Sequence, residues 1–274
     1  MKKVFLLLWF FTVIGTNATL ASDGYESITI NDKNMRIYQK GENDTIIVLL
    51  SGWGTENPID DFKPLIDTLS SDYKVIAIEY FGYGKSVITK DARSNKAIVE
   101  EIRAALQAVK VNPPYILMPH SMSGLYALSY ANSYPEEVSA IIGIDASVPQ
   151  KQLERWTKES FEACKLDETS SDLSIAIVNQ WNSFFDNSME LKNVKYPANL
   201  PVLSFLATEQ VNAVDEMIRT KEMKTSWFKI NKNMITNANI QFIKILKGGH
   251  YLHHTQAETI SKLSKQFLHN VSKN

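Results

Sequence analysis

Short, continuously apolar segments alternate with longer segments of helical periodicity, and this alternation constrains the fold of the 274-residue chain more than any other feature. The apolar segments lack the strict alternation of a half-exposed strand, as the Ile-Ile-Val-Leu-Leu run ending at Leu50 illustrates. The periodic segments place apolar residues on one helix face, for example Ile98, Ile102 and Leu106. Buried strands that alternate with amphipathic helices predict an α/β domain with a doubly wound, mostly parallel sheet.

These two patterns predict strands and helices along most of the chain. The strands are expected at Ser27 to Ile30, Met35 to Tyr38, Thr45 to Leu50, Lys74 to Tyr80, Tyr115 to Met118, Val138 to Ile144, Val202 to Leu206 and Ile240 to Leu246. The first two should form a hairpin around Asn31-Asp32-Lys33. The helices are expected at Lys63 to Leu69, Lys96 to Val109, Gly124 to Ser133 and Ala257 to Val271.

The stretch from Ser147 to Leu200 interrupts the alternation. It contains no convincing strand, and its aromatic residues are scattered among polar ones: Trp156, Phe161, Trp181, Phe184 and Phe185. We expect a helical cap insertion at about residues 147–200. Its aromatic side chains either line an apolar pocket as a lid or pack a helical layer onto the domain, and packing is the safer account for most of them.

The first residues have the pattern of a targeting segment. Lys2 and Lys3 precede the apolar run from Val4 to Ile14, and the small residues of Ala18-Thr19-Leu20-Ala21 follow, which is typical of a secretory signal. We therefore expect residues 1–21 to be a signal peptide or, since no charge occurs from Val4 to Ser22, an uncleaved anchor. Residues 22–274 should form one domain, and the protein should be secreted or extracytoplasmic. A buried N-terminal strand or helix is the alternative.

Composition excludes several function classes. Lys and Arg number 29 against 30 Asp and Glu, so no basic field exists to bind nucleic acid. The single cysteine, Cys164, excludes an intrachain disulfide framework and a cysteine-rich zinc or iron–sulfur site. We expect no nucleic-acid partner, and membrane contact only through an uncleaved N-terminal anchor.

The segment Pro119-His120-Ser121-Met122-Ser123-Gly124 lies between an expected strand and an expected helix. A serine on such a tight turn projects its hydroxyl above the sheet, and the following helix offers backbone N–H groups to a developing oxyanion. The turn is cramped, so the residues two positions before and after the nucleophile should be small. Ser121 satisfies this condition, whereas a nucleophile at Ser123 would have Leu125 two positions later. A helix-capping serine without chemistry is the alternative.

With this segment the chain resembles the α/β-hydrolase family over nearly everything after the leader. In the G-x-S-x-G elbow of that family, Pro119 and Ser123 would replace the two glycines, and the resemblance implies that Ser121 is the nucleophile. Ser51-Gly52-Trp53-Gly54 looks like the family's H-G-x-G oxyanion loop with serine in place of histidine. The resemblance therefore implies that the backbone N–H groups of Trp53 and Met122 hold the oxyanion.

The resemblance also implies a base and an acid. His250 follows Gly248-Gly249 near the C-terminus, as in the family's G-G-H segment, with His253 and His254 as nearby alternatives. We favour Asp145 as the acid because it ends an expected strand, and Glu209 is the alternative, since the family commonly places its acid after the next strand. Either acid preserves the chain order of serine, acid and histidine.

These residues predict a serine hydrolase that cleaves a carboxylic ester or related small-molecule acyl compound through an acyl-enzyme intermediate. No cofactor is expected. No metal is expected either, because neither an H-E-x-x-H pattern nor a placed carboxylate accompanies the three C-terminal histidines His250, His253 and His254. An aminopeptidase or acyltransferase of the same fold is an alternative, since a triad fixes mechanism better than substrate. A non-catalytic small-molecule-binding module that has lost turnover is the alternative from another class.

Overall fold

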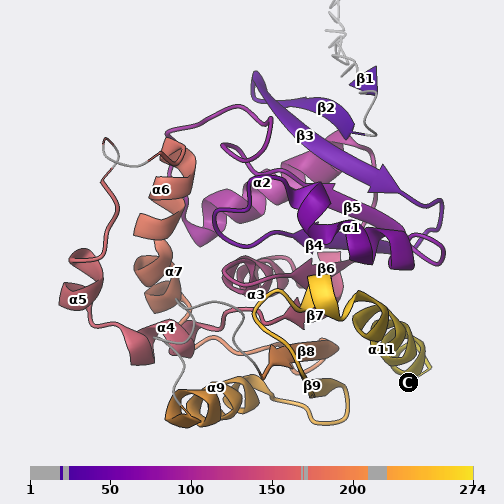
Figure 1. The fold of residues 1–274 in the computed structure, drawn as a ribbon. Coiled ribbons are helices and arrows are strands. Elements are labelled where there is room, and N and C mark those ends of the chain that lie inside the picture. The colour runs from indigo at the N-terminus through magenta and orange to yellow at the C-terminus, as the bar shows by residue number, and fades with distance from the viewer. Residues whose placement is uncertain (1–18, 21–24, 168, 170–171, 209–220, 274) are drawn as a thin grey trace, which may run out of the picture.

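A nine-stranded sheet forms the centre of the protein in a computed structural model (Figure 1). The strand order is β1-β2-β3-β5-β4-β6-β7-β8-β9, with antiparallel pairing from β1 to β5 and parallel pairing from β5 to β9. The strands are β1 (Thr19–Leu20), β2 (Tyr25–Ile30), β3 (Lys33–Lys40), β4 (Ile46–Leu50), β5 (Lys74–Ile78), β6 (Tyr115–Pro119), β7 (Val138–Ile144), β8 (Val202–Ala207) and β9 (Gln241–Leu246). The structure describes residues 19–20, 25–167, 169, 172–208 and 221–273.

Helices cover both faces of the sheet and confirm the predicted doubly wound α/β class. Along β4, Ile47 and Leu49 face a cluster that includes α1 (Pro58–Leu69), α10 (Leu252–Thr255) and α11 (Ala257–Val271). The alternate residues of β4, such as Val48, face a cluster with α2 (Asn95–Ala108) and α3 (Ser123–Ser133). A single 3₁₀ turn, η1 (Pro135–Glu137), leads into β7.

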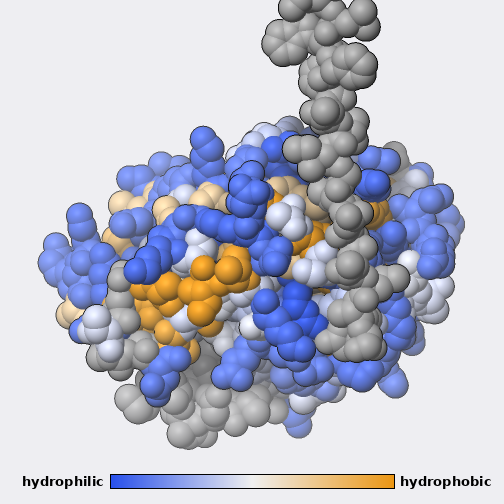
Figure 2. Space-filling view, turned by 90° about the horizontal axis from the view of Figure 1, so that it is seen from above, coloured by the Kyte–Doolittle hydropathy of each residue, from blue (hydrophilic) through white to orange (hydrophobic). Residues whose placement is uncertain are grey.

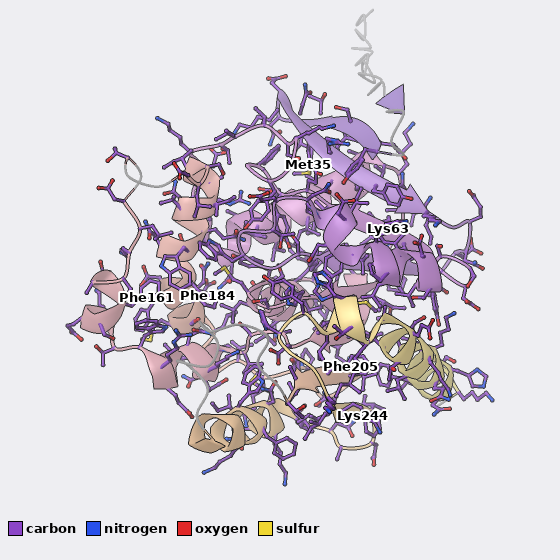
Figure 3. All side chains as sticks on the ribbon, in the orientation of Figure 1. Met35, Lys63, Phe161, Phe184, Phe205 and Lys244 are labelled. Carbon is purple, nitrogen blue, oxygen red and sulfur yellow. The ribbon has the colours of Figure 1, made fainter. Side chains whose placement is uncertain are left out.

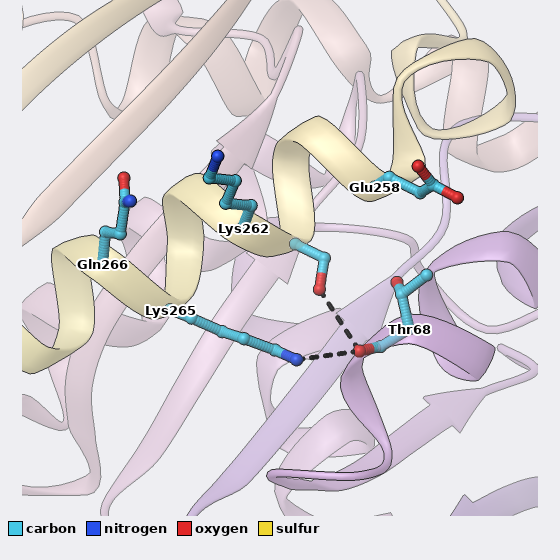
Figure 4. Close-up of a pocket in the computed structure, with 6 residues that line it drawn as sticks. Thr68, Glu258, Lys262, Lys265 and Gln266 are labelled. Atoms are coloured by element: carbon cyan, nitrogen blue, oxygen red, sulfur yellow. Dashed lines mark hydrogen bonds between the residues drawn. The ribbon is translucent and has the colours of Figure 1, made fainter.

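Two hydrogen bonds hold α11 against the last turn of α1. Ser261 Oγ and Lys265 Nζ donate to the carbonyl oxygen of Thr68 at 3.3 and 3.1 Å (Figure 4). The shallow depression beside these bonds is lined also by Glu258, Lys262 and Gln266. Since α1 starts at the carboxyl edge of β4 and runs back, its last turn lies toward the amino edge of the sheet. The depression is therefore remote from the strand ends that carry the candidate site.

The residues between β7 and β8 form the helical insertion. The described part of 147–200 holds α4 (Pro149–Arg155), α5 (Lys158–Glu162), α6 (Ile175–Asn182) and α7 (Phe184–Glu190), and no strand. Seen from above, apolar residues gather on the side of the molecule that carries this insertion, with hydrophilic residues around them (Figure 2). None of the helices described is long and apolar enough to cross a membrane.

Most aromatic side chains of the insertion pack within it. Phe161 is 1% exposed, and its ring lies 5.6 Å from that of Phe185 and 5.7 Å from that of Trp181. Phe184, labelled with Phe161 in Figure 3, also contacts Trp181. Core packing thus accounts for the phenylalanines. Trp181 is only partly buried and reaches Trp53 at a ring distance of 5.1 Å.

The expected strands and helices lie close to the observed ones, with some differences, among them the short elements β1 and α10, which the sequence patterns do not predict. The helix expected at Lys63 begins five residues earlier, at Pro58, because Asn57 caps it through its side chain and proline suits the first helical position. Helix α9 (Lys221–Met234) was not expected, although Trp227, Ile230 and Met234 give it a buried face. Most of the expected leader, residues 1–18 and 21, lies outside the described residues.

Candidate active site

The turn after β6 has a backbone strained in the way that a nucleophile elbow requires. Ser121 has a φ of 52°, in the left-handed region that costs a non-glycine residue energy. Three backbone hydrogen bonds hold it there: His120 N to Leu50 O, Ser121 N to Ile144 O, and Ser147 N to Ser121 O, at 2.9, 3.3 and 2.7 Å. The neighbouring strand ends therefore fix the turn, and the Ser121 side chain stays partly exposed.

Ser123 has a structural place in the same turn. It is fully buried, its Oγ donates to the carbonyl oxygen of Ser51 at 2.5 Å, and the hydroxyl of Tyr80 lies 3.0 Å from it. It thereby joins the start of α3 to the end of β4. A buried hydroxyl with these partners is not available to a substrate, which agrees with the choice of Ser121 as the reactive serine of the segment.

A chain of hydrogen bonds joins the three residues expected to act together. Nε2 of His250 lies 2.8 Å from Ser121 Oγ, and Nδ1 of His250 lies 2.7 Å from Asp145 Oδ2. Because a carboxylate only accepts, the Nδ1–H of the neutral ring donates to Asp145 and leaves a lone pair on Nε2 to accept the Ser121 hydroxyl proton. The predicted serine, histidine and acid thus meet at the carboxyl ends of β6, β7 and β9, although 129 positions separate Ser121 from His250.

Asp145 is held on its other side by groups from β8 and α9. It is fully buried, and its Oδ1 accepts from Ala207 N at 3.2 Å and from the indole Nε1 of Trp227 at 3.1 Å. Trp227 was not among the expected site residues, because its helix was not expected either. The alternative acid, Glu209, lies outside the described residues.

The loop after β4 packs directly against the elbow. A Cβ atom added to Gly52 would lie 2.9 Å from His120 Nδ1 and 3.1 Å from Ser121 Cβ, so only glycine fits without displacement. Within the part of the chain that the structure describes, the backbone N–H groups of Trp53 and Met122 donate to no protein acceptor. Both groups predicted to hold an oxyanion are therefore free of partners among the described residues.

Two contacts connect this loop to the insertion. The indole of Trp53 donates to the carbonyl oxygen of Ile177 on α6 at 2.9 Å. The amide of Gly54 donates to the hydroxyl of Tyr83 at 3.1 Å, and that hydroxyl donates to Gln180 Oε1 on the same helix. Gln180 is fully buried, so α6 supports the loop through a polar contact that water does not reach.

The remaining histidines lie apart from the hydroxyl of Ser121. His120 is buried, with its ring 4.6 Å from that of His250 and its Nε2 3.2 Å from the His250 carbonyl oxygen. His253 is buried beside Asp61, His254 contacts the other oxygen of Asp61, and His269 is exposed on α11. Of the three histidines near the C-terminus, His250 contacts Ser121, whereas His253 and His254 contact Asp61.

Comparisons with known proteins agree with this architecture. The family model described as alpha/beta hydrolase fold matches residues 45–163, which include Ser121 and Asp145. Solved structures superpose over most of the chain: an esterase from Thermogutta terrifontis has a TM-score of 0.62 at 13% identity, covering 90% of this chain and 98% of its own. The chain thus has the α/β-hydrolase fold, and its residues 45–163 match the family model of that fold.

Further relatives and structural neighbours extend the comparison. The uncharacterized protein YbdG of Bacillus subtilis is 27% identical over 89% of this chain and 85% of its own length. A pimeloyl-[acyl-carrier protein] methyl ester esterase of Yersinia pseudotuberculosis is 30% identical over 45% of each chain. A lipase-like protein of Acinetobacter baumannii has a TM-score of 0.61 at 18% identity, covering 91% of this chain and 92% of its own. The family-model match and the esterase-like relatives support a hydrolase.

Proposed function

We propose that the protein is a serine hydrolase that cleaves a carboxylic ester or a related acyl compound through an acyl-enzyme. The hydrogen-bonded chain of Ser121, His250 and Asp145, with distances of 2.8 and 2.7 Å, carries this proposal. The left-handed backbone of Ser121 and the N–H groups of Trp53 and Met122, which have no partner among the described residues, support the same conclusion.

In the proposed reaction, Ser121 Oγ attacks the acyl carbon while His250 Nε2 takes its proton. Asp145 holds the ring in the tautomer that can accept this proton and stabilises the imidazolium that forms. His250 then gives the proton to the leaving oxygen, which departs as an alcohol and leaves the acyl group on Ser121. A water molecule, deprotonated by the same nitrogen, attacks the acyl carbon; the bond to Ser121 Oγ then breaks, His250 returns the proton to that oxygen, and the carboxylic acid leaves.

The negative charge of each tetrahedral intermediate would lie beside Trp53 and Met122. Their backbone N–H groups are the two donors we assign to it, and removal of one such donor costs about 10²–10³ in kcat in other serine hydrolases. Gly52 allows the close approach of the loop that this arrangement needs. The tie from Gly54 through Tyr83 to Gln180 holds that loop in place before substrate arrives.

The names of relatives guide the choice of substrate class. The pimeloyl methyl ester esterase and the Thermogutta esterase both act on esters by name, so we propose a small-molecule ester as substrate. The partly exposed pair Trp53 and Trp181 gives the acyl or alcohol part an apolar surface near the loop.

Turnover of a chromogenic short-chain ester, measured together with labelling by a fluorophosphonate, tests the proposal. Wild-type protein should hydrolyse the ester and carry the label on Ser121. Ser121→Ala should lose both while its circular dichroism spectrum is unchanged. Ser123→Ala serves as the matched control, because this buried hydroxyl should be dispensable for labelling even if its loss lowers the melting temperature.

The outcomes distinguish the alternatives. A protein that binds esters or acyl compounds but neither turns them over nor reacts with the phosphonate would be a binding module. Labelling at Ser121 with amide cleavage, or with transfer to an alcohol in preference to water, would indicate an aminopeptidase or an acyltransferase. A label on Ser123 would contradict the assignment of the elbow.

We also propose that residues 1–21 direct export, either as a cleaved signal or as an anchor. Lys2 and Lys3 before the apolar run from Val4 to Ile14 support this. Cleavage after Ala21 would remove only β1, an edge strand that pairs with β2 alone, so the other strand pairs would persist. Intact-mass measurement of protein from its native host should show loss of about 20 residues or membrane association. A full-length protein confined to the soluble cytoplasmic fraction would contradict the proposal.

A further inference from the structure

Asp61, His120 and His253 come from three separate segments and meet beneath the candidate active site. Asp61 lies in the first turn of α1, His120 in the elbow, and His253 in α10. Each offers one ligand atom, and the three atoms all lie within 4.8 Å of one another. His253 is fully buried, His120 is 1% exposed, and the Asp61 side chain is 9% exposed.

Polar atoms in this cluster lack partners although they are buried. Asp61 Oδ2, His120 Nδ1 and both ring nitrogens of His253 make no hydrogen bond with the described residues. Nε2 of His253 lies 3.1 Å from Asp61 Oδ2, but the two atoms are not aligned for a hydrogen bond. Because a buried polar group without a partner destabilises the folded state, four such atoms at one place indicate a ligand, and an ion that takes one atom from each side chain would complete three of them.

The contact of His120 with the loop after β9 leaves a ring nitrogen of His120 available to a metal ion. His120 Nε2 lies 3.2 Å from the carbonyl oxygen of His250, which only accepts, so Nε2 carries the proton and the lone pair is on Nδ1.

We propose that Asp61, His120 and His253 bind a divalent transition-metal ion with the chemistry of Zn²⁺. Two nitrogens and one carboxylate oxygen are a donor set that this ion accepts, and a fourth position would be left for water. Ligands about 2.0–2.1 Å from a tetrahedral ion lie about 3.3 Å apart, close to the 3.1 Å between His253 Nε2 and Asp61 Oδ2. The other distances between ligand atoms, which reach up to 4.8 Å, must shorten through small side-chain rotations when the ion binds.

The surroundings supply the outer contacts typical of a metal site. His254 Nε2 lies 2.8 Å from Asp61 Oδ1 and so fixes the carboxylate through the oxygen that the ion does not need. The His120 contact with the His250 carbonyl fixes its ring in the same way. The bound ion would join α1, the elbow and α10, and would thus steady the loop that carries His250. This proposal departs from the expectation of no metal, which considered only histidines near the C-terminus and no carboxylate.

Zinc binding by the full-length protein tests the site without recourse to activity. Protein stripped with a chelator is dialysed against Zn²⁺ alone, and bound zinc is measured by mass spectrometry with the melting temperature in parallel. One ion per chain and a raised melting temperature are expected. Co²⁺ in place of Zn²⁺ should give the visible absorption of a four-coordinate site with nitrogen and oxygen ligands.

Matched variants locate the ion. Asp61→Asn keeps the shape of the side chain and should weaken zinc binding at least tenfold, as should His253→Gln. His269→Gln, which changes an exposed histidine on α11, should bind as the wild type does. Absence of saturable binding overturns the proposal, as does unchanged affinity in a folded Asp61→Asn variant, even where His253→Gln fails to fold. In those cases buried water would satisfy the cluster.

Discussion

The indole Nε1 of Trp227 donates to Asp145 at 3.1 Å, on the carboxylate oxygen that His250 does not contact. Ala207 N shares that oxygen, so the carboxylate is fixed from β8 and α9 on one side and by His250 on the other. A carboxylate that cannot rotate holds the imidazole more firmly in its reactive orientation. Trp227, 82 positions from Asp145, is therefore a positioning residue of the proposed triad.

Replacing the indole tests this role. Trp227→Phe keeps an aromatic ring in the core but removes the donor, and a hydrogen bond to a charged group is worth about 1.5–3 kcal/mol. We expect kcat for a chromogenic ester to fall about tenfold or more with KM nearly unchanged, because the substrate does not contact this residue. Steady-state kinetics of the purified variant provide the measurement.

Trp156→Phe is the matched control for that variant. The Trp156 indole nitrogen makes no hydrogen bond with any described residue, so the change removes ring area but no donor. Its kcat should stay near the wild-type value. Equal losses of kcat in the two variants would mean that packing, and not the bond to Asp145, explains the effect.

The two candidate acids are separated by amide substitutions. Asp145→Asn should reduce kcat by several orders of magnitude, since the same change of the triad aspartate in a serine protease costs about 10⁴ in kcat. Glu209→Gln should leave kcat within about tenfold. Melting temperatures measured alongside distinguish chemistry from stability. A stable and fully active Asp145→Asn enzyme would transfer the role to Glu209 or another residue.

The sequence predicts those parts of the candidate site that depend on local patterns. The elbow around Ser121, the loop at Gly52 and the histidine after Gly248-Gly249 are each a few residues long and follow apolar runs that are readable as strands. Because parallel strands end at one edge of a sheet, these three segments could be expected to converge. The same reasoning favours Asp145 over Glu209, since Asp145 directly follows β7.

Contacts between distant segments could not be read from local patterns. Trp227 contacts Asp145 only because the folded chain brings α9 to the end of β7, and Asp61 meets His253 only because α1 packs against α10. The apolar spacing of Trp227, Ile230 and Met234 was a signal for α9 itself, but not for what its indole contacts. Which residue such a side chain contacts depends on how the helices pack in the folded protein.

The buried bond network behind Gly54 gives a third prediction. Tyr83→Phe removes the hydroxyl that accepts from the partly buried Gly54 N and donates to the fully buried Gln180, so both groups lose this partner. The free energy of unfolding should fall by about 1–3 kcal/mol, and kcat should fall because the loop is less well held. Tyr73→Phe is the control, since its hydroxyl has no hydrogen bond to the described residues; comparable losses there would contradict the interpretation.

The buried carboxyl of Glu79 should make the free energy of unfolding depend on pH. Burial raises the pKa of this carboxyl above its ordinary value, although Lys85 N donates to it at 2.9 Å and Arg36 lies 4.0 Å away. The folded state therefore keeps the proton to higher pH than the unfolded chain does. The stabilising effect is complete below the unfolded pKa of about 4.3 and is lost as pH rises through the folded pKa.

Comparison with Glu79→Gln isolates that effect. The stability of the wild type relative to the variant should be highest near pH 4 and should fall as pH rises, reaching a plateau once Glu79 is ionised in both states. Denaturant unfolding at a series of pH values measures the difference. A difference that is constant, or that increases with pH, would show that the folded protein does not hold the carboxyl in its neutral form.

Substitution of Gly52 tests whether the loop after β4 places the Trp53 amide beside the nucleophile. In Gly52→Ala the new Cβ would lie 2.9 Å from His120 Nδ1 and 3.1 Å from Ser121 Cβ, so the loop or the elbow must shift. A shift of the Trp53 amide away from the oxyanion should lower kcat by about 10²–10³. In Gly54→Ala the Cβ would meet no atom within 4 Å, while its φ of 73° should cost about 1–2 kcal/mol in stability. Measured kcat and melting temperature should therefore separate the two variants: Gly52→Ala should lose mainly turnover, and Gly54→Ala should lose mainly stability. Full activity in Gly52→Ala would remove Trp53 from the proposed mechanism.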